Sequence, residues 1–496
     1  MPDQNAPQHG GCPIRVTPRF AVRLALPRPA LAPVLLLGWC GALFFYGLAA
    51  GPLYRTESLR AIIGAEALRG HWLYPVLHGE PFLTKPPGQY AAIALASLPV
   101  DRVTEVTARL PSAIAATAAV LLMAALFRHV LGGRAGLLAG LLVPCSVLWL
   151  DKAPSAEIDM TLVGWVTASL VLFHHALEAQ GRKHLGLLVA SLLCLAAGTL
   201  TKWTAPAFFA LTAVPLLVWC GRLRLLVSSS FLLAAGVAVA AVAGWAALVT
   251  QQVGGDALAD TVRKEAAYRF APKPGSKGYP WAEVLTYPLL VWAAHLPLSL
   301  FALRTLRRGF AARWDDHGRL LLAFLHCWAW PNLIFWALVP NHNVRYALPL
   351  SPALMGLGVM GLLDWWRYRE APSLRPPLRL VAAFLILWLS VKVMFVEVVI
   401  PRRTAGRNAE VTAAALRGLV PVGEPLHLLK LKDEGVLFYY GRPTRKLSSP
   451  AELPRAAYVA LIEGEWREWE ANRTGELVQW MYDQQGDPLI LARTNP

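Results

Sequence analysis

Long apolar runs separated by short polar segments repeat along the first 400 residues of the chain. A helix needs about 20 apolar residues to cross about 30 Å of hydrocarbon, and eleven runs approach that length. They cover residues 31–51, 107–127, 135–150, 160–178, 185–201, 204–220, 225–250, 281–303, 319–340, 346–364 and 378–400. The pattern predicts an all-α polytopic membrane protein with about eleven transmembrane helices in residues 31–400.

From Pro401 onward the pattern changes. Short apolar runs such as PLHLLKL, AAYVALI and PLILA alternate with more polar segments. This alternation is typical of a small α/β fold. We therefore expect residues 401–496 to form a small soluble α/β domain, and residues 1–30 to form an N-terminal tail.

Composition supports the membrane class and argues against an ordinary soluble protein and against a nucleic-acid-binding protein. The 496 residues are 56% hydrophobic and 16% charged, with a mean hydropathy of +0.44, which is too apolar for an ordinary soluble protein of this length. The formal net charge is +16, but the cations lie between apolar runs instead of on one soluble face, so a nucleic-acid partner is not indicated. Six scattered cysteines without CxxC spacing are interpreted as packing residues.

The positions of the cations predict the topology. Four arginines between Arg15 and Arg28 precede the first run without a cleavage-site pattern, so we expect a cytoplasmic tail followed by an uncleaved first helix. The positive-inside rule then places the Arg-rich loops, such as the one with Arg182, in the cytoplasm. This holds only if Gln89–Val100, about a dozen residues, is a juxtamembrane helix. The loops 51–104, 151–160 and 251–280 and the C-terminal domain then share the outer side.

Two acidic residues in these outer loops are candidates for catalysis. Glu57 opens a helix-like run in which Leu59–Leu68 could form an apolar face along the membrane surface. Asp159 lies at the entrance of a span, with Glu157 and Asp151 as alternatives. Alone, each acid fits a charge or cap at a helix start. Together, carboxylates from separate loops can hold a divalent cation or place a general base beside a hydroxyl.

Cations at the outer ends of the spans form a complementary set. Any one of them could simply extend toward lipid headgroups, but their number on the side that the positive-inside rule disfavours indicates a phosphate clamp. Two prolines follow the first of these lysines and fix the approach of its chain. The set consists of Lys85, Lys202, Arg263, Arg269 and Arg345, with Tyr346 adjoining in the junction NHNVRY.

The segment HWLYPVLHGEPFLTKPPGQY (His71–Tyr90) resembles the ArnT-like and protein-mannosyltransferase-like membrane glycosyltransferases, glycosyltransferase family 39. The likeness continues in the family's order through ARLPSAIAA, IDMTL, GTLTKW and VRYALPLSPAL, over roughly residues 50–355. The resemblance implies the GT-C fold, with juxtamembrane helices beside the transmembrane ones.

It also implies an activity: transfer of a sugar from a polyprenyl-phosphate donor to a lipid, glycan or protein acceptor, on the outer (periplasmic or exterior) face of the cytoplasmic membrane. In-line displacement would invert the anomeric centre. By the family match, Glu57 and Asp159 occupy the acidic positions, and Lys85 contacts the carrier phosphate, with Lys202, Arg269 and Arg345 as further candidates. The family commonly has Asp-Glu where this chain has Thr56-Glu57. Either Glu57 substitutes for the missing Asp, or Asp159 alone carries the role.

Two other classes remain open, as does the cofactor. A transporter or flippase of lipid-linked intermediates would place ionisable residues near the midplane and often shows repeats, which the sequence lacks. A structural assembly protein would leave the polar loops without a purpose. The sequence identifies no definite cofactor, and Glu57 and Asp159 could hold a divalent cation. His71, His78, His295 and His342 lack the HxxxH or HExxH spacing of a zinc site.

Overall fold

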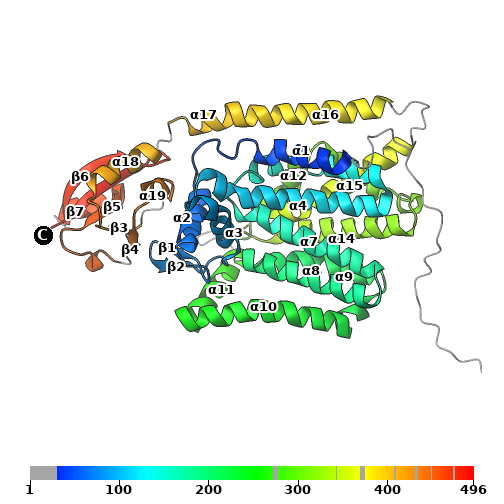
Figure 1. Ribbon diagram of the computed structural model, residues 1–496, viewed down its shortest axis with the longest axis horizontal. Coiled ribbons are helices and arrows are strands. Elements are labelled where there is room, and N and C mark those ends of the chain that lie inside the picture. Colours follow the sequence, from blue (N-terminus) through cyan, green and yellow to red (C-terminus); the bar gives the residue numbers. More distant parts are fainter. Residues whose placement is uncertain are drawn as a thin grey trace, which may run out of the picture.

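The computed structural model describes residues 31–271, 278–341, 343–368, 375–406, 409–430, 434–447, 449–472 and 475–495. The N-terminal tail that we predict for residues 1–30, and His342, lie outside the described residues. Within them the chain forms a bundle of apolar helices with a smaller α/β domain at one end (Figure 1).

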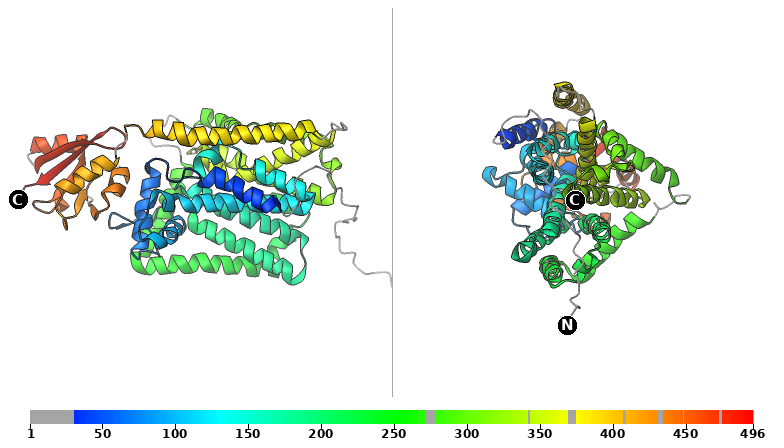
Figure 2. Two further views of the ribbon diagram at one scale, coloured as in Figure 1. Left: turned by 45° about the horizontal axis from the view of Figure 1, so that its top comes forward. Right: turned by 90° about the vertical axis from the view of Figure 1, so that its right-hand side faces the viewer.

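Seven helices in the described part are long and apolar enough to cross a membrane, and they run side by side (Figure 2). An eighth candidate is a bent pair, α12 (Trp281–Ala294) with α13 (Leu298–Ala302) and η5 (Leu303–Leu306). The seven are α4 (Glu105–Leu131), α7 (Ile158–Glu178), α8 (Gly181–Thr201), α10 (Ser229–Val253), α14 (Asp316–Leu338), the run of η7 (Val344–Leu350) into α15 (Ser351–Tyr368), and the run of α16 (Arg375–Met394), η8 (Phe395–Val399) and α17 (Ile400–Thr404).

Shorter apolar helices account for the other predicted spans. They are α1 (Ala32–Cys40) with η2 (Gly41–Phe45), α5 (Gly133–Leu142) and α9 (Ala205–Trp219). Each of the eleven predicted runs therefore coincides with an apolar helix or helix pair, and the polytopic helical class is confirmed. Two 3₁₀ turns, η4 (Leu223–Val227) and η6 (Ala311–Arg313), lie in connecting segments.

Two predicted spans are not single straight helices. The run 135–150 ends its first helix at Leu142 and continues, after a turn containing Pro144, as α6 (Val147–Lys152). The run 281–303 bends by 107° between α12 and α13, where Pro297 precedes the second helix. A proline has no N–H to donate and its ring clashes with the preceding turn, so an apolar run that contains one can break. A hydropathy profile alone does not predict these breaks.

Burial separates central from peripheral helices. In α7 and in residues 344–366, 78% and 94% of the most apolar stretch is buried in the bundle, whereas in α10 and in residues 378–404 the share is 17%. Figure 1 accordingly shows α10 and α16 at opposite edges of the bundle. Small residues allow the central helices to approach closely, since a Cβ at Gly361 of α15 would collide with the carbonyl oxygen of Phe301 in α13.

The loop before α4 forms a layer across the end of the bundle next to the α/β domain (Figure 1). It contains α2 (Thr56–Leu68), the hairpin of β1 (Val76–Leu77) and β2 (Glu80–Pro81), α3 (Gly88–Ser97) and η3 (Leu98–Val100). The helix α3 with η3 corresponds to the juxtamembrane segment predicted for Gln89–Val100. The apolar face predicted along the membrane surface instead packs against protein: Ile63 is buried, Ala61 shares a buried cluster with Ile93 of α3, and Ile62 contacts the core of the α/β domain.

The C-terminal domain is a five-stranded mixed sheet in the order β4-β3-β5-β7-β6. The strand β3 (Leu426–Leu428) is parallel to β4 (Thr444–Lys446) and β5 (Tyr458–Ile462), and β7 (Pro488–Thr494) is antiparallel to β5 and β6 (Gly475–Tyr482). The helices are α18 (Ala409–Leu419), α19 (Glu434–Tyr440), η9 (Pro450–Glu452) and α20 (Glu463–Asn472).

Both faces of this sheet are covered, which explains the continuous apolar run YVALI in β5. Ala460 faces the cluster formed by α18 and α19, and its neighbours Val459 and Leu461 face Trp466 and Trp469 of α20. The predicted α/β character is therefore confirmed. The preceding helical run continues to Thr404, past the predicted start of the domain at residue 401.

Candidate functional site

An acidic residue at the start of α7 lies at the centre of an ion network. Asp159 is in the first turn of the helix, and its side chain is buried. Its Oδ1 accepts a hydrogen bond from Nζ of Lys202, 2.5 Å away, and its Oδ2 lies 3.7 Å from Nε of Arg345. Lys202 directly follows α8, and Arg345 is in the first turn of η7. Three membrane helices therefore bring these charges together at one end of the bundle.

The network continues into the loop before α7. Arg345 Nη1 also pairs with a carboxylate oxygen of Glu157, whose other oxygen lies 3.1 Å from Nζ of Lys152. Lys152 in turn lies 3.0 Å from Asp151. Negative and positive groups alternate along this chain of contacts, so each buried charge is compensated by a neighbour of opposite sign.

The ring of Tyr346 makes cation–π contacts with three of the cations. The ring centroid lies 4.8 Å from Lys202 Nζ, 4.9 Å from Arg269 Cζ and 5.9 Å from Arg345 Cζ, within the range of cation–π attraction. Nη1 of Arg269 is buried and has no hydrogen-bond partner among the described residues. A buried guanidinium donor without a partner is costly unless a ligand supplies an acceptor.

Lys85, the lysine of the KPP motif, joins the same group of charges. Its Nζ donates to Glu265 of α11 (Gly255–Phe270) at 2.5 Å and to the Thr84 carbonyl oxygen at 3.1 Å. Burial lowers the pKa of Lys85 to about 8. Glu265 opposes that shift, while the nearby charges of Arg269 and Lys202 add to it. Lys85, Lys202 and Arg269 are thus close enough to repel one another.

Arg263 lies apart from this group. It is on α11, six residues before Arg269, but its side chain is 78% exposed and pairs with Asp260 one turn earlier. Of the sequence-predicted residues, the structure therefore brings Lys85, Asp159, Lys202, Arg269, Arg345 and Tyr346 together and leaves Arg263 outside.

Glu57 lies beside the network and is fully engaged in other contacts. Its two oxygens accept from Nε and Nη2 of the buried Arg109, at 3.0 and 3.1 Å, and Oε1 also accepts from the backbone N–H of Ala156 at 2.9 Å. Arg109 donates further to the carbonyl oxygens of residues 48, 50, 51 and 52. Glu57 thereby joins the start of α2, the helix α4 and the loop that contains Ala156 and Glu157 and leads into α7, where Asp159 lies.

Residues 84–247 match the family described as dolichyl-phosphate-mannose-protein mannosyltransferase. The crystal structure of ArnT from Cupriavidus metallidurans bound to undecaprenyl phosphate matches with a TM-score of 0.73 at 16% identity, over 93% of this chain and 97% of that one. The oligosaccharyltransferase of Archaeoglobus fulgidus in its apo form matches with a TM-score of 0.54 at 12% identity, over 94% and 74% of the two chains. None of the curated protein sequences matches this chain.

The structural match to ArnT covers almost the whole of both chains, including the C-terminal domain. The protein has the GT-C fold. The resemblance drawn from the KPP block is confirmed, and the family match begins at Thr84, beside Lys85. The family match covers about a third of the chain, and the two structural matches, at 16% and 12% identity, show its fold.

The two acids predicted to hold a metal do not fit one in this GT-C protein. Both oxygens of Glu57 accept hydrogen bonds from nitrogen donors, and Asp159 is paired with a lysine and lies near an arginine. Cations of the protein thus occupy the positions from which the carboxylates would bind a metal ion.

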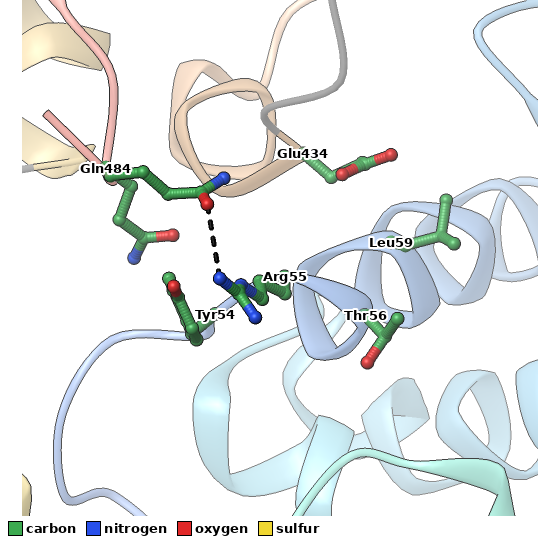
Figure 3. Close-up of a pocket in the computed structure, with 7 residues that line it drawn as sticks. Tyr54, Arg55, Thr56, Leu59, Glu434 and Gln484 are labelled. Carbon is green, nitrogen blue, oxygen red and sulfur yellow. Dashed lines mark hydrogen bonds between the residues drawn. The ribbon is translucent and has the colours of Figure 1, made fainter. Parts of the chain in front are cut away.

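A separate polar cavity of about 240 Å³ lies between the start of α2 and the C-terminal domain (Figure 3). It is lined by Tyr54, Arg55, Thr56, Leu59, Glu434, Gln484 and Gln485. Arg55 adopts a positive φ of 51° and donates to Gln485 Oε1 at 3.3 Å. Thr56, which stands where the family commonly has Asp, is among the residues that line this cavity.

Three participants had no predicted role. Glu265 is the partner of Lys85, Arg109 is the partner of Glu57, and Lys152 bridges two acids. The spacing of Glu265 and Arg269, one helical turn apart in the outer loop, and the position of Arg109 inside the block ARLPSAIAA are signals in the sequence. Neither signal shows which charges are partners, since the partners come from different segments.

Proposed function

We propose that this protein transfers a sugar from a polyprenyl-phosphate donor to a polar acceptor on a lipid, glycan or protein, at the outer face of the cytoplasmic membrane. The single observation that carries the proposal is the group of four cations, Lys85, Lys202, Arg269 and Arg345, three of them around the ring of Tyr346. A phosphate at the edge of the bilayer needs such a group, with arginine donating two parallel hydrogen bonds and lysine supplying a point charge.

Arg269 is the first cation available to the phosphate. Its Nη1 is buried without a partner in the described part of the chain, whereas Lys85, Lys202 and Arg345 each pair with a carboxylate. The ArnT structure bound to undecaprenyl phosphate, which has the same fold, supports a polyprenyl phosphate as the carrier. The lipid tail would extend from the ends of the membrane helices into the bilayer.

Binding of the phosphate would then release Asp159, the proposed base, from its hydrogen bond with Lys202. Lys202 can contact either the phosphate or Asp159, and a phosphate that attracts Lys202 weakens its hydrogen bond to the carboxylate. Asp159 is thereby left with the unshared charge needed to accept a proton from the acceptor. The base would become active only when the donor is present, which would limit wasteful hydrolysis.

The transfer step follows from this polarity. The acceptor oxygen attacks the anomeric carbon as the bond from that carbon to the phosphate oxygen breaks, and the acceptor's proton passes to Asp159. Negative charge grows on the leaving phosphate, where the four cations stabilise it. The attack is opposite to the leaving group, so the anomeric configuration inverts. Glu57 would hold the loop of Asp159 in place without exchanging a proton.

The acceptor would approach from the side of the C-terminal domain. Guanidinium, amide and hydroxyl groups line the cavity at the start of α2 (Figure 3), and they suit a polar acceptor such as a glycan. A transporter has less support, because the network lies at the ends of α7 and α8 instead of near the midplane.

Two variants on one helix test the donor site. We expect Arg269→Ala to weaken the binding of undecaprenyl phosphate to the purified protein about tenfold or more, because a hydrogen bond to a charged group contributes about 1.5–3 kcal/mol. Arg263→Ala is the matched control, and we expect it to change the Kd by less than about twofold. Equal losses in both variants would contradict the assignment of the phosphate site.

Asp159→Asn distinguishes donor binding from sugar transfer when both are measured. This variant removes a negative charge next to the cations, so it should bind undecaprenyl phosphate at least as tightly as the unaltered protein. Sugar transfer in membranes supplied with polyprenyl-phosphate sugars should fall by about 10²–10⁴-fold. Transfer at the original rate would exclude Asp159 as the base.

A further inference from the structure

Four histidines and one glutamate meet at the far end of the bundle. His129 is in the last turns of α4, His174, His175 and Glu178 end α7, and His317 begins α14. At the other end of α4, Glu105 contacts Tyr439 of the C-terminal domain, so this cluster and the proposed transfer site lie at opposite ends of the same helices (Figure 1). The length of α7 separates them, about 30 Å at 1.5 Å per residue.

The ligand-type atoms of three of these residues are already close together. One ring nitrogen each of His129 and His175 and a carboxylate oxygen of Glu178 lie within 4.8 Å of one another. In a tetrahedral zinc site with bonds of about 2.1 Å, the ligand atoms lie about 3.4 Å apart. Small rotations of these three side chains, of which His129 is exposed and the other two are partly buried, therefore suffice to form the site.

The carboxylate of Glu178 is surrounded by the imidazoles. Oε2 lies 3.3 Å from Nε2 of His129, Oε1 lies 2.8 Å from Nδ1 of His317, and His174 Nδ1 lies 4.0 Å from Oε2. His317 can serve as a fourth ligand or hold the carboxylate in place, as residues behind a metal ligand commonly do.

His174 is the observation that ordinary hydrogen bonding does not explain. Its side chain is fully buried, and neither ring nitrogen has a hydrogen-bond partner among the described residues. A glutamate bridging surface histidines would account for His129 and His317. It would leave a buried imidazole beside Glu178 with both nitrogens unsatisfied, which is costly.

The cluster is also accessible. The side chains of His129 and His317 are 54% and 53% exposed, while Glu178 is 16% exposed. A metal ion can thus enter from one side, with His174 behind it. Lys183, at the start of α8, acts electrostatically on His175 and is the opposing cation that a bound metal would have to tolerate.

We propose that His129, His175 and Glu178, with His317 or His174 completing the coordination, bind a zinc ion that cross-links α4 and α7, and also α14 where His317 is the fourth ligand. Imidazole and carboxylate ligands together favour a first-row transition metal, whereas Mg²⁺ and Ca²⁺ prefer oxygen ligands. The site is structural and independent of the proposed sugar transfer, because none of its residues belongs to the ion network around Asp159.

The experiment measures metal binding by the full chain, purified without a histidine tag and stripped with a chelator. We expect one Zn²⁺ per chain by elemental analysis after dialysis, visible absorption bands when Co²⁺ replaces Zn²⁺, and a melting temperature that rises with Zn²⁺ but not with Mg²⁺. His175→Gln should weaken Zn²⁺ binding more than about tenfold, since the loss of even a supporting residue has effects of that size.

His71→Gln is the matched control, because His71 is an exposed histidine that also lies 4.0 Å from a glutamate but is outside the cluster. Equal zinc content in the unaltered protein, His71→Gln and His175→Gln would overturn the proposal. A second measurement needs no variant: Zn²⁺ should protect His129, His175 and His317 of the unaltered chain from chemical modification of histidine. Modification of these residues at the same rate with and without Zn²⁺ would also overturn it.

Discussion

The chemistry of Lys85 depends more on its surroundings than on its residue type. Its ammonium group is buried among other cations, and the pKa falls from 10.5 to about 8. A lysine in water has a pKa of about 10.4 and stays mostly charged up to about pH 10. At this position, a small rise in pH above neutrality removes the charge that we assign to phosphate binding.

This pKa sets a prediction for donor binding. Below pH 8 Lys85 is protonated and can attract the phosphate; as the pH rises through 8 the charge is lost in the unliganded protein, so affinity should fall. We expect the Kd for undecaprenyl phosphate to rise about tenfold between pH 7 and pH 9.5, a range above the second phosphate pKa of about 6. Lys85→Arg keeps its charge throughout and should bind with little change over this range. Identical pH profiles in the two proteins would contradict the role of Lys85.

At the scale of elements, Glu57 and Arg109 fix three segments relative to one another. Glu57 belongs to α2, Arg109 to α4 and Ala156 to the loop before α7. Arg109 also donates hydrogen bonds to four backbone carbonyl oxygens of the segment between η2 and α2. The loop that contains Glu157, and with it the first turn of α7 with Asp159, is positioned through this junction.

These contacts of Glu57 predict that Glu57→Gln lowers the stability of the protein as well as its transfer activity. The variant leaves Arg109 buried without a compensating charge, and breaking a buried pair in this way costs about 3–5 kcal/mol. We expect a lower melting temperature of the purified protein together with reduced transfer. If Glu57→Gln abolished transfer and left the melting temperature unchanged, Glu57 would be a chemical group instead of a positioning residue.

At the scale of the whole molecule, the C-terminal domain is joined to the end of the bundle by three hydrogen bonds, one of them buried and two partly buried. The Tyr439 hydroxyl donates to Glu105 Oε1 at 2.6 Å and accepts from the backbone N–H of Leu53 at 3.0 Å, and Gln484 Nε2 donates to the Leu53 carbonyl oxygen at 2.9 Å. Burial and the bond to Glu105 raise the pKa of Tyr439, so it remains a donor. The domain thus holds the chain that leads into α2.

Removing one hydroxyl tests this coupling. Tyr439→Phe should speed hydrogen exchange at Leu53, whose N–H loses its acceptor, and destabilise the junction by about 1–3 kcal/mol. Exchange measured by mass spectrometry over the peptide containing Leu53 would report it. Tyr482→Phe is the control, because that side chain is 60% exposed. Equal exchange in the two variants would show that the C-terminal domain does not order this segment.

The sequence by itself determined the membrane class, the positions of the apolar helices and the α/β domain. Hydrophobic burial depends on composition over whole segments, and that can be read without knowing which segments touch. It also determined which residues to consider: Lys85, Asp159, Lys202, Arg269, Arg345 and Tyr346 all meet in the fold.

Only the tertiary structure decided which charged side chains pair with one another. Arg263 and Arg269 have the same residue type on the same helix, yet one points to solvent and the other to Tyr346. Glu57 and Asp159 resemble each other as acids at helix starts, yet one is bound by an arginine and the other by a lysine. A charge acts over a few ångströms through its neighbours and its burial, and these come from segments that are remote in the sequence.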